Sequence, residues 1–305
     1  YIAEFGSGPN FVVYSNIDDA LALLKTDISI DIAHICAPPV QTWYDSGLIE
    51  KWDFDRLPNA TFEFTQFEND PQFASVLDYF VPYEFGTTGI IYNSDQVPYG
   101  DTTSLDIFKD PVYAGRVSLP IFIDDIMPLA FLASGTQDWN NPTDAEITKA
   151  FDWLREVHPN VHSYWSDEDE LQSLLITEKI LISWGWNNIN HEASMYNANL
   201  AFNNGPEAGI SSWTCGFVKM KNATGHDDQA YAYVNAALDE KSAKVLLSWG
   251  LGLANVEAMS AVATEKELIS MGLLAPGTPK FVETPLATDV RARFVEEFEK
   301  IRAGL

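Results

Sequence analysis

Strand-like and helix-like segments alternate along the chain, and this alternation limits the possible fold more than any other feature. A β-branched and aromatic run at Phe11 to Tyr14 is followed by helical apolar spacing at Ile17 to Lys25 and by a strand-like run at Ile30 to Cys36. Such a βαβ rhythm favours a parallel sheet covered by helices. We therefore predict an α/β protein.

The same alternation continues to the end of the chain. Apolar runs between turn or helix signals predict strands at Gly89 to Tyr92, Arg116 to Ile121, Lys179 to Trp184 and Gly216 to Met220. Helical spacing predicts helices at Gln229 to Leu238, Lys241 to Trp249 and Val290 to Ile301. A further helix is predicted to begin at a capping box formed by Thr143 and Glu146 and to end at His158-Pro159.

The charge balance excludes some functions and leaves one question open. The chain has 305 residues, with 18 Lys and Arg against 44 Asp and Glu, which gives a formal net charge of −26. The sequence has no basic run or stripe that could bind the phosphates of a nucleic acid, so we expect no nucleic-acid partner. No apolar run approaches the ~18 residues of a spanning helix, so we expect no membrane insertion. The acidity is explained either by surface solvation or by a field that attracts cationic ligands.

Cysteine and histidine give little indication of chemistry. Cys36 and Cys215 lie far apart without CxxC spacing, so a disulfide is possible, but we expect buried free thiols. His158 and His162 are separated by Pro159, which breaks the helix that would align them, so no metal or cofactor is expected. The first residues look like the end of a helix already under way, so we expect a removed or unobserved segment before them.

Two features are candidates for ligand contact. Asp124 and Asp125 follow a predicted strand and are either ligand-facing carboxylates or ordinary helix-cap residues. Trp184 and Trp186 follow another predicted strand, and Trp213 precedes a third. Ligands of parallel α/β sheets bind beyond the carboxyl ends of strands, so these indoles are placed either to enclose a ligand or to pack in the core.

Five stretches then occur in a recognisable order along roughly residues 1 to 250. They are residues 31–49, the most specific stretch VPYEFGTTGIIYN at 81–93, residues 115–119, residues 159–184 and residues 207–220. In this order they resemble the periplasmic spermidine/putrescine-binding proteins, the soluble receptors of ABC importers. The residues after about 250 match only loosely.

The resemblance implies a type II periplasmic binding protein fold, with two α/β lobes, crossing strands and a central cleft. Lobe 1 would hold residues 1–92 and about 216–265, and lobe 2 would hold residues 93–215 and about 266–305. The protein would be periplasmic and would deliver its ligand to a membrane ABC permease after hinge closure.

The resemblance also implies a set of ligand-binding residues. Trp184 and Trp213 align with tryptophans that enclose the ligand, and Asp125 aligns with an acid that binds an amino group. The full predicted set is Asp125, Trp184, Trp186, Asn187, Trp213, Cys215, Ser212, Phe122, Phe85 and Ala37. Asn188, Ser211 and Thr214 would supply neutral hydrogen bonds.

Several positions depart from the family pattern. Cys215 and Phe122 stand where polyamine binders have acids, and Asn187 lies near a third such position. A buried ammonium without carboxylates carries a desolvation cost of several kcal/mol. With Asp125 as the one remaining acid, the ligand is expected to be a polyamine or, alternatively, a monoamine or a zwitterion such as γ-aminobutyrate.

Two other interpretations remain open. A zwitterion needs a partner for its carboxylate, and Arg116 is the candidate in this sequence. A more remote alternative is a hydrolytic enzyme that uses Asp124 and Asp125 with His191 as acid and base. The two classes differ in that the enzyme shows turnover, whereas the binding protein takes up ligand stoichiometrically.

Overall fold

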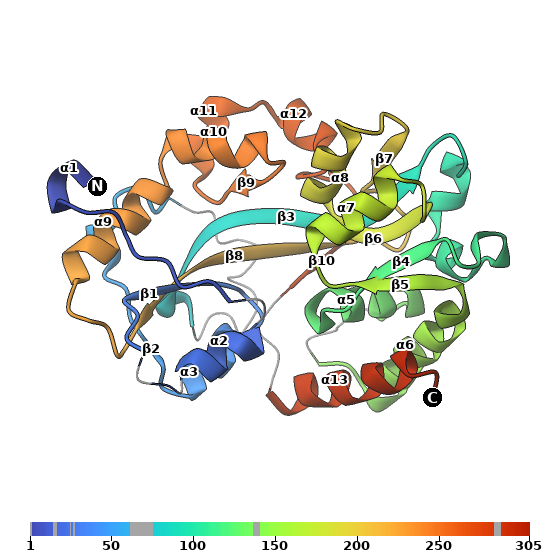
Figure 1. Ribbon diagram of the computed structural model, residues 1–305, viewed down its shortest axis with the longest axis horizontal. Helices are drawn as coiled ribbons and strands as arrows, with labels where there is room; N and C mark the ends of the chain where they lie inside the picture. Colours follow the sequence, from blue (N-terminus) through green and yellow to red (C-terminus); the bar gives the residue numbers. More distant parts are fainter. Residues whose placement is uncertain are drawn as a thin grey trace.

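A single mixed sheet runs through the molecule and carries helices on its flanks (Figure 1). The computed structural model describes residues 2–14, 17–24, 26, 28–61, 76–136, 141–283 and 288–305. The strands of the described residues are β1 (Ile32–Cys36), β2 (Ile49–Glu50), β3 (Phe80–Asn93), β4 (Val117–Pro120), β5 (Val161–Trp165), β6 (Ile182–Trp186), β7 (Leu200–Asn203), β8 (Ile210–Met220), β9 (Gly252–Leu253) and β10 (Lys280–Val282).

The α-helices of the described residues surround this sheet. They are α1 (Ile2–Phe5), α2 (Ile17–Leu24), α3 (Val40–Asp45), α5 (Ile123–Ser134), α6 (Asp144–Val157), α7 (Glu168–Ile176), α8 (Asn187–Ser194), α9 (Asp227–Ala237), α10 (Glu240–Ser248), α11 (Val256–Val262), α12 (Glu265–Ser270) and α13 (Thr288–Arg302). The capping box of Thr143 and Glu146 is present at the start of α6, as predicted. The helices predicted near 229–238, 241–249 and 290–301 correspond to α9, α10 and α13.

The strands β3 and β8 connect the two halves of the molecule. They pair antiparallel from Phe80 opposite Val218 to Thr88 opposite Ser211. Figure 1 shows both strands crossing the middle of the molecule, from the side of β1, α2 and α3 to the side of β4, β5, α5 and α6. The main path of the sheet is β1-β8-β3-β6-β4-β5. Residues on β3 and β8 therefore lie where the two halves meet.

The direction of strand pairing corrects the sequence prediction of a parallel sheet. β4 pairs parallel with β5 and β6, but β3 pairs antiparallel with β6 and β8, and β8 pairs antiparallel with β1. The reason is that β3 and β8 cross between the halves in opposite directions. Hydrophobic periodicity identifies a strand but not the direction of its neighbour.

Separate hydrophobic clusters stabilise the two sides. One cluster contains Trp43, Phe80 and Val218 beside β1 and α3. Another contains Phe131 and Phe294 between α5, α6 and α13. Since each side buries its own apolar residues, each has a core that does not depend on the cleft between them.

Two strand predictions are wrong in detail. Phe11 to Tyr14 forms no strand, and Phe11 remains 72% exposed, because no neighbouring strand pairs with this run. The strand predicted at Lys179 to Trp184 is β6, which begins at Ile182 and includes Trp186. As a result Trp184 and Trp186 lie within the strand rather than beyond its end.

Candidate functional site

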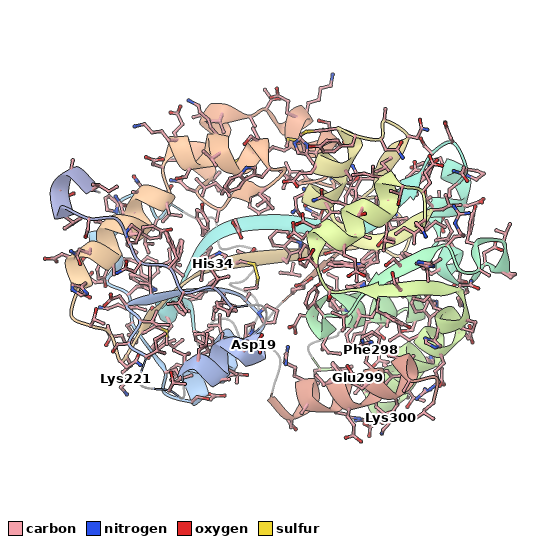
Figure 2. The ribbon with its side chains drawn as sticks, in the orientation of Figure 1. Asp19, His34, Lys221, Phe298, Glu299 and Lys300 are labelled. Atoms are coloured by element: carbon pink, nitrogen blue, oxygen red, sulfur yellow. A yellow bond between two sulfur atoms is a disulfide. The ribbon has the colours of Figure 1, made fainter. Side chains whose placement is uncertain are left out.

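A cavity of about 930 Å³ lies between the two sides of the molecule. Its walls come from the end of β1, the middle of β3 and β8, the start of α5, the junction of β6 with α8, and α13. Figure 2 places His34 on the β1 side and Phe298 and Glu299 on α13, and all three line the cavity. The size is typical of a pocket for a small molecule.

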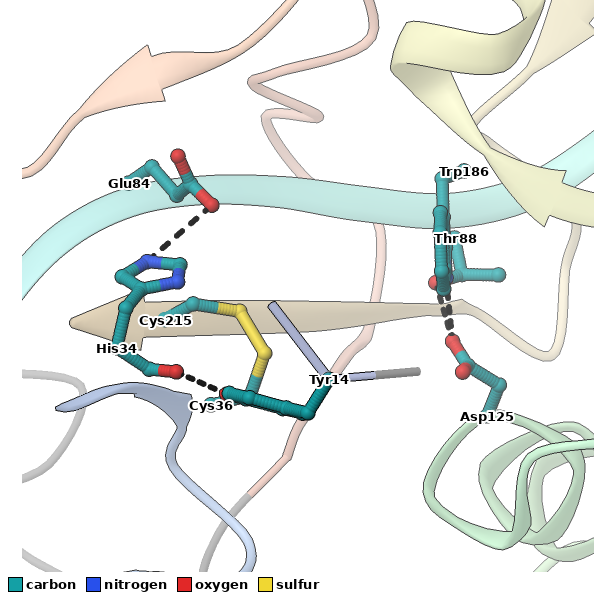
Figure 3. Close-up of a disulfide and its surroundings, with 8 residues drawn as sticks. All are labelled: Tyr14, His34, Cys36, Glu84, Thr88, Asp125, Trp186 and Cys215. Atoms are coloured by element: carbon teal, nitrogen blue, oxygen red, sulfur yellow. Dashed lines mark hydrogen bonds and ion pairs between the residues drawn. A yellow bond between two sulfur atoms is a disulfide. The ribbon is translucent and has the colours of Figure 1, made fainter. Parts of the chain in front are cut away.

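Asp125 is the central carboxylate of the cavity. It lies in the first turn of α5 and is only 6% exposed. The indole Nε1 of Trp186 donates to Asp125 Oδ1 at 2.6 Å, and Thr88 Oγ1 donates to the same oxygen at 3.5 Å (Figure 3). Burial, with a smaller contribution from the charge of Asp124, raises the pKa of Asp125 to about 7 despite the hydrogen bonds from Trp186 and Thr88. The surroundings of this carboxylate therefore supply too little positive charge to stabilise its ionised form.

A second buried acid, Glu283, lies beside Asp125. It follows β10, is 3% exposed, and accepts a hydrogen bond from Ser211 Oγ at 2.6 Å. Burial and then the charge of Asp125 raise the pKa of Glu283 well above its usual value. Arg291 lines the same cavity, and its Nη2 lies 3.1 Å from Asp124 Oδ2.

Aromatic rings form the apolar walls next to these acids. The rings of Phe122 and Trp186 are stacked with centroids 6.0 Å apart, and Trp186 meets Trp213 edge to face at 6.2 Å. Trp213 lies against Gly86, where an added Cβ would be 2.3 Å from the indole Cζ2. The indole fits here because Gly86 has no side chain. Both tryptophans and Phe122 line the cavity.

The other end of the cavity contains a disulfide and a histidine–glutamate pair. Cys36 and Cys215 form a disulfide, which corrects the prediction of free thiols. The physical reason is register, because the two residues lie directly opposite each other on β1 and β8. His34 Nε2 lies 3.5 Å from Glu84 Oε1, and the Tyr14 hydroxyl donates to the His34 carbonyl (Figure 3).

Glu84 and Glu168 are the carboxylates of this end. Burial raises the pKa of each to about 7, with repulsion from Glu168 adding to the effect on Glu84. Burial lowers the pKa of His34 to about 4, so the imidazole is neutral at pH 7 and does not balance these charges. Asn188 Nδ2 donates to Glu168 Oε2 at 3.2 Å.

Five predicted site residues lie outside the cavity lining. Trp184 is fully buried in the core against Phe108. Asn187 holds backbone groups of Thr87, Gly250 and Met271 together. Phe85 packs against Gly252, while Ala37 and Ser212 are buried. Of the further candidates, Ser211 holds Glu283, and Thr214 is buried with its carbonyl accepting from Ala37 N.

The residues proposed for a carboxylate partner and for catalysis are not brought together. Arg116 donates to the carbonyls of Glu178 and Lys179 and does not line the cavity. His191 lies beside Gly250 and is likewise absent from the lining, whereas Asp124 and Asp125 belong to it. The arrangement expected of an acid–base pair with His191 is therefore not formed.

Most of the acids that line the cavity were not predicted from the sequence. The expectation of a single carboxylate is wrong, because Glu84, Glu168 and Glu283 also line the cavity. Glu84 lies directly opposite Cys215 in the β3–β8 register. Glu84 could have been noticed in the sequence, because it is the one charged residue in the stretch 81–93. Glu283 had no such signal, since it comes from a distant part of the chain.

A cleft lined by indoles and carboxylates, between two α/β halves that share crossing strands, defines the class of two-lobed solute-binding proteins. The chain belongs to the family of bacterial extracellular solute-binding proteins, which it matches over residues 10–281. This match confirms the resemblance and the fold predicted from the sequence.

Curated relatives carry names consistent with this family. The chain is 27% identical to spermidine/putrescine-binding periplasmic protein 1 of Haemophilus influenzae over 223 residues, covering 72% of this chain and 59% of that protein. It is 30% identical to the spermidine/putrescine-binding periplasmic protein of Escherichia coli over 171 residues, covering 55% of this chain and 48% of that protein. The chain thus spans about half the length of the curated relatives. The predicted periplasmic location agrees with these names and with the extracellular family.

Solved structures agree in fold. A spermidine/putrescine ABC transporter substrate-binding protein from Streptococcus pneumoniae has a TM-score of 0.79 at 17% identity, covering 99% of this chain and 93% of that one. The binding protein MotA from A. tumefaciens B6, in complex with glucopine, has a TM-score of 0.78 at 20% identity, covering 99% and 92%. Because ligands differ among these structures, the fold does not select the ligand. Among the described residues, no helix is long and apolar enough to cross a membrane.

Proposed function

We propose that this protein is the substrate-binding component of an ABC importer and captures a small amine-bearing solute, with polyamines such as putrescine or spermidine first among them. The observation that carries the proposal is the charge of the cavity. Its lining contains six acidic residues, which are Glu84, Asp124, Asp125, Glu168, Glu283 and Glu299, against Arg291 and the neutral His34.

An ammonium group would relieve the electrostatic cost of this arrangement. Buried carboxylates that lack cations are expensive, and their raised pKa values express that cost. A bound ammonium supplies both charge and hydrogen-bond donors. The faces of Trp186 and Trp213 attract a cation or cover its methylene chain, at roughly 0.5 to 2 kcal/mol for each contact.

A zwitterion such as γ-aminobutyrate is the second candidate ligand. Arg291 lines the same cavity and is the group that a ligand carboxylate would approach. Arg291 is already paired with Asp124 at 3.1 Å, so the ligand carboxylate would have to share or displace this pair. Because of this competition, we expect the cavity to bind a zwitterion more weakly than a simple amine. An uptake role without turnover also fits the family better than hydrolysis.

We also propose how the two halves act in transport. Residues 1–92 with about 216–265 would form lobe 1, and residues 93–215 with about 266–305 would form lobe 2. β3 and β8 cross between them, so bending at these strands would close the cavity on its ligand. The closed form would then be delivered to a membrane ABC permease.

Thermal-shift screening tests the proposed ligand class. Spermidine, putrescine and γ-aminobutyrate are compared with a sugar and an inorganic anion, and an amine should raise the melting temperature with a concentration dependence that follows mass action. Asp125→Asn and Trp213→Ala should each weaken the best amine. Glu257→Gln and Trp249→Ala change exposed residues outside the cavity and serve as matched controls. A response to the sugar or anion alone contradicts the proposal.

A further inference from the structure

The floor of the cavity is formed by β1, β3 and β8, and it contains the disulfide of Cys36 and Cys215 (Figure 3). Both cysteines line the cavity. Cys215 is 5% exposed, whereas Cys36 is an exposed residue. A solute that fills the cavity would therefore cover the bond. Exposed disulfides are the ones that exchange with thiols, while buried disulfides resist reduction.

The disulfide marks the level at which β8 changes its neighbour. The pairing of β1 with β8 ends at Cys36 opposite Cys215, and β10 pairs with β8 up to Val282 opposite Ser212. Both partners lie on the same edge of β8, because β3 occupies the other edge along this stretch. The crosslink thus closes the β1 ladder where β8 leaves that side of the molecule.

β3 is irregular at the same level. Pro82 lies opposite Gly216 and Glu84 lies opposite Cys215, so Tyr83 is an extra residue on β3 at this point. A bulge bends its strand and interrupts the ladder locally. Since β8 changes its neighbour beside this bulge, we expect bending between the two halves to concentrate at the level of the disulfide.

Reduction has to change the shape of the cavity floor. The sulfur atoms of a disulfide are about 2 Å apart, whereas non-bonded atoms in contact stand roughly 3.5–4 Å apart. Cys36 and Cys215 lie directly opposite each other, so the added distance must come from movement of their side chains or of the end of β1. Pro38 and Pro39 follow β1 and line the cavity, so movement there also changes its wall.

We propose that Cys36–Cys215 is a redox site coupled to the solute in the cleft. The oxidised protein binds its solute more tightly than the reduced protein does, and bound solute protects the disulfide from a dithiol reductant. The two effects are the same coupling free energy measured at two sites. The inference rests on the proposed function only in requiring that a solute binds in this cavity.

The chemistry is thiol–disulfide exchange with the dithiol as the source of two electrons. One thiol of the reductant loses its proton and attacks Cys36 Sγ, the exposed member, to form a mixed disulfide. Cys215 leaves as a thiolate and takes up a proton. The second thiol of the reductant then loses its proton and displaces Cys36, which is protonated in turn. The protein disulfide is reduced to two thiols, and the dithiol is oxidised to its own disulfide.

Calorimetric titration of the oxidised and the dithiothreitol-reduced protein with spermidine tests the coupling. The oxidised protein should bind about tenfold more tightly, which lies within the usual range of couplings between sites. Saturating spermidine should then lower the midpoint potential of the disulfide by about 30 mV, as measured by thiol alkylation in dithiothreitol buffers. A variant with Cys36→Ala and Cys215→Ala should have an affinity that dithiothreitol does not change.

The rate of reduction distinguishes attack through the cavity from attack after unfolding. Ile49→Val removes a methyl group from a residue that is 5% exposed, packs in the core beside β1 and lies outside the cavity lining. This variant should be reduced at the rate of the parent, and spermidine should slow both. A rate that rises with the loss of stability refutes the redox site, and this test holds even where the reduced protein does not stay folded.

The remaining outcomes separate the inference from the proposed function. Equal affinities of the two redox forms, or a midpoint potential that spermidine leaves unchanged, refute the coupling while the proposed function stands. If spermidine binds neither form, the proposed function fails for this ligand and the coupling fails with it.

Discussion

Gly86 illustrates how a single residue shapes the cavity wall. Its missing side chain is the space into which the Trp213 indole fits, and Asn187 Oδ1 would be only 2.7 Å from an added Cβ. Asn187 in turn binds Thr87 N and two carbonyls, so this one position joins the cavity wall to the surrounding backbone. A methyl group at residue 86 would therefore have to displace either the Trp213 indole, which forms the cavity wall, or the Asn187 side chain.

Gly86→Ala should destabilise the protein by about 1–3 kcal/mol, as overpacked core substitutions do, and should weaken amine binding. Gly100→Ala is the matched control, because an added Cβ there meets nothing within 4 Å. Urea unfolding and calorimetry measure the two effects. Equal stability and affinity for both variants would show that Trp213 is not fixed by Gly86.

At the scale of elements, β8 holds the site together. It pairs with β1, β3, β2 and β10, it carries Trp213 and Cys215 into the cavity, and its Ser211 holds Glu283. The disulfide fixes β8 to β1 beside Glu84, across a sequence separation of 179 residues. This crosslink thus restrains the unfolded chain strongly and also sets the position of the cavity floor.

Replacing both Cys36 and Cys215 by Ala should lower the free energy of unfolding by about 2–5 kcal/mol, because a long loop is no longer closed in the unfolded state. Urea unfolding of the variant and of the oxidised parent measures the difference. Reductant should shift the parent toward the variant and leave the variant unchanged. A parent whose unfolding midpoint does not respond to the loss of the crosslink would contradict this account of the disulfide.

The sequence predicted the type of fold and part of the site, for physical reasons that differ from residue to residue. Thr143 and Glu146 were found because a capping box is local in sequence. Asp125 and Trp213 were proposed through family resemblance, and Trp186 through its place after a predicted strand. Trp184 was predicted to contact the ligand. It lies instead inside β6, because this strand begins and ends later in the chain than the apolar run indicates. Glu283 and the Cys36–Cys215 bond could not be predicted, since both depend on contacts between distant strands.

At the scale of the whole molecule, the net charge of −26 extends into the cavity instead of stopping at the surface. Glu84, Asp125 and Glu168 have folded-state pKa values of about 7, above those of the unfolded chain. The native state then binds more protons than the unfolded state, so stability falls as pH rises toward and through 7. The protein is thus destabilised by the same carboxylates that would bind a cation.

Between pH 6.5 and 8 the unliganded protein should therefore lose stability, while spermidine affinity should rise by roughly fourfold for each carboxylate with a pKa of about 7. Over this range His34 opposes the trend only weakly, because its folded-state pKa is lowered to about 4 and the unfolded-state imidazole loses the rest of its proton just above its ordinary pKa of 6.5. Melting curves with and without spermidine measure both effects, and Glu84→Gln should reduce the slope. Stability that increases over this range would contradict the assignment.

The central claim is that the acidic cleft binds an amine cation, and a calorimetric titration of the unsubstituted protein with spermidine at pH 8 and low salt tests it most directly. We predict saturable single-site binding that Asp125→Asn weakens by about tenfold or more, because a charged hydrogen-bond partner is lost. Absence of binding by spermidine, putrescine and γ-aminobutyrate, in a sample that is folded and binds a non-amine solute, would contradict the claim.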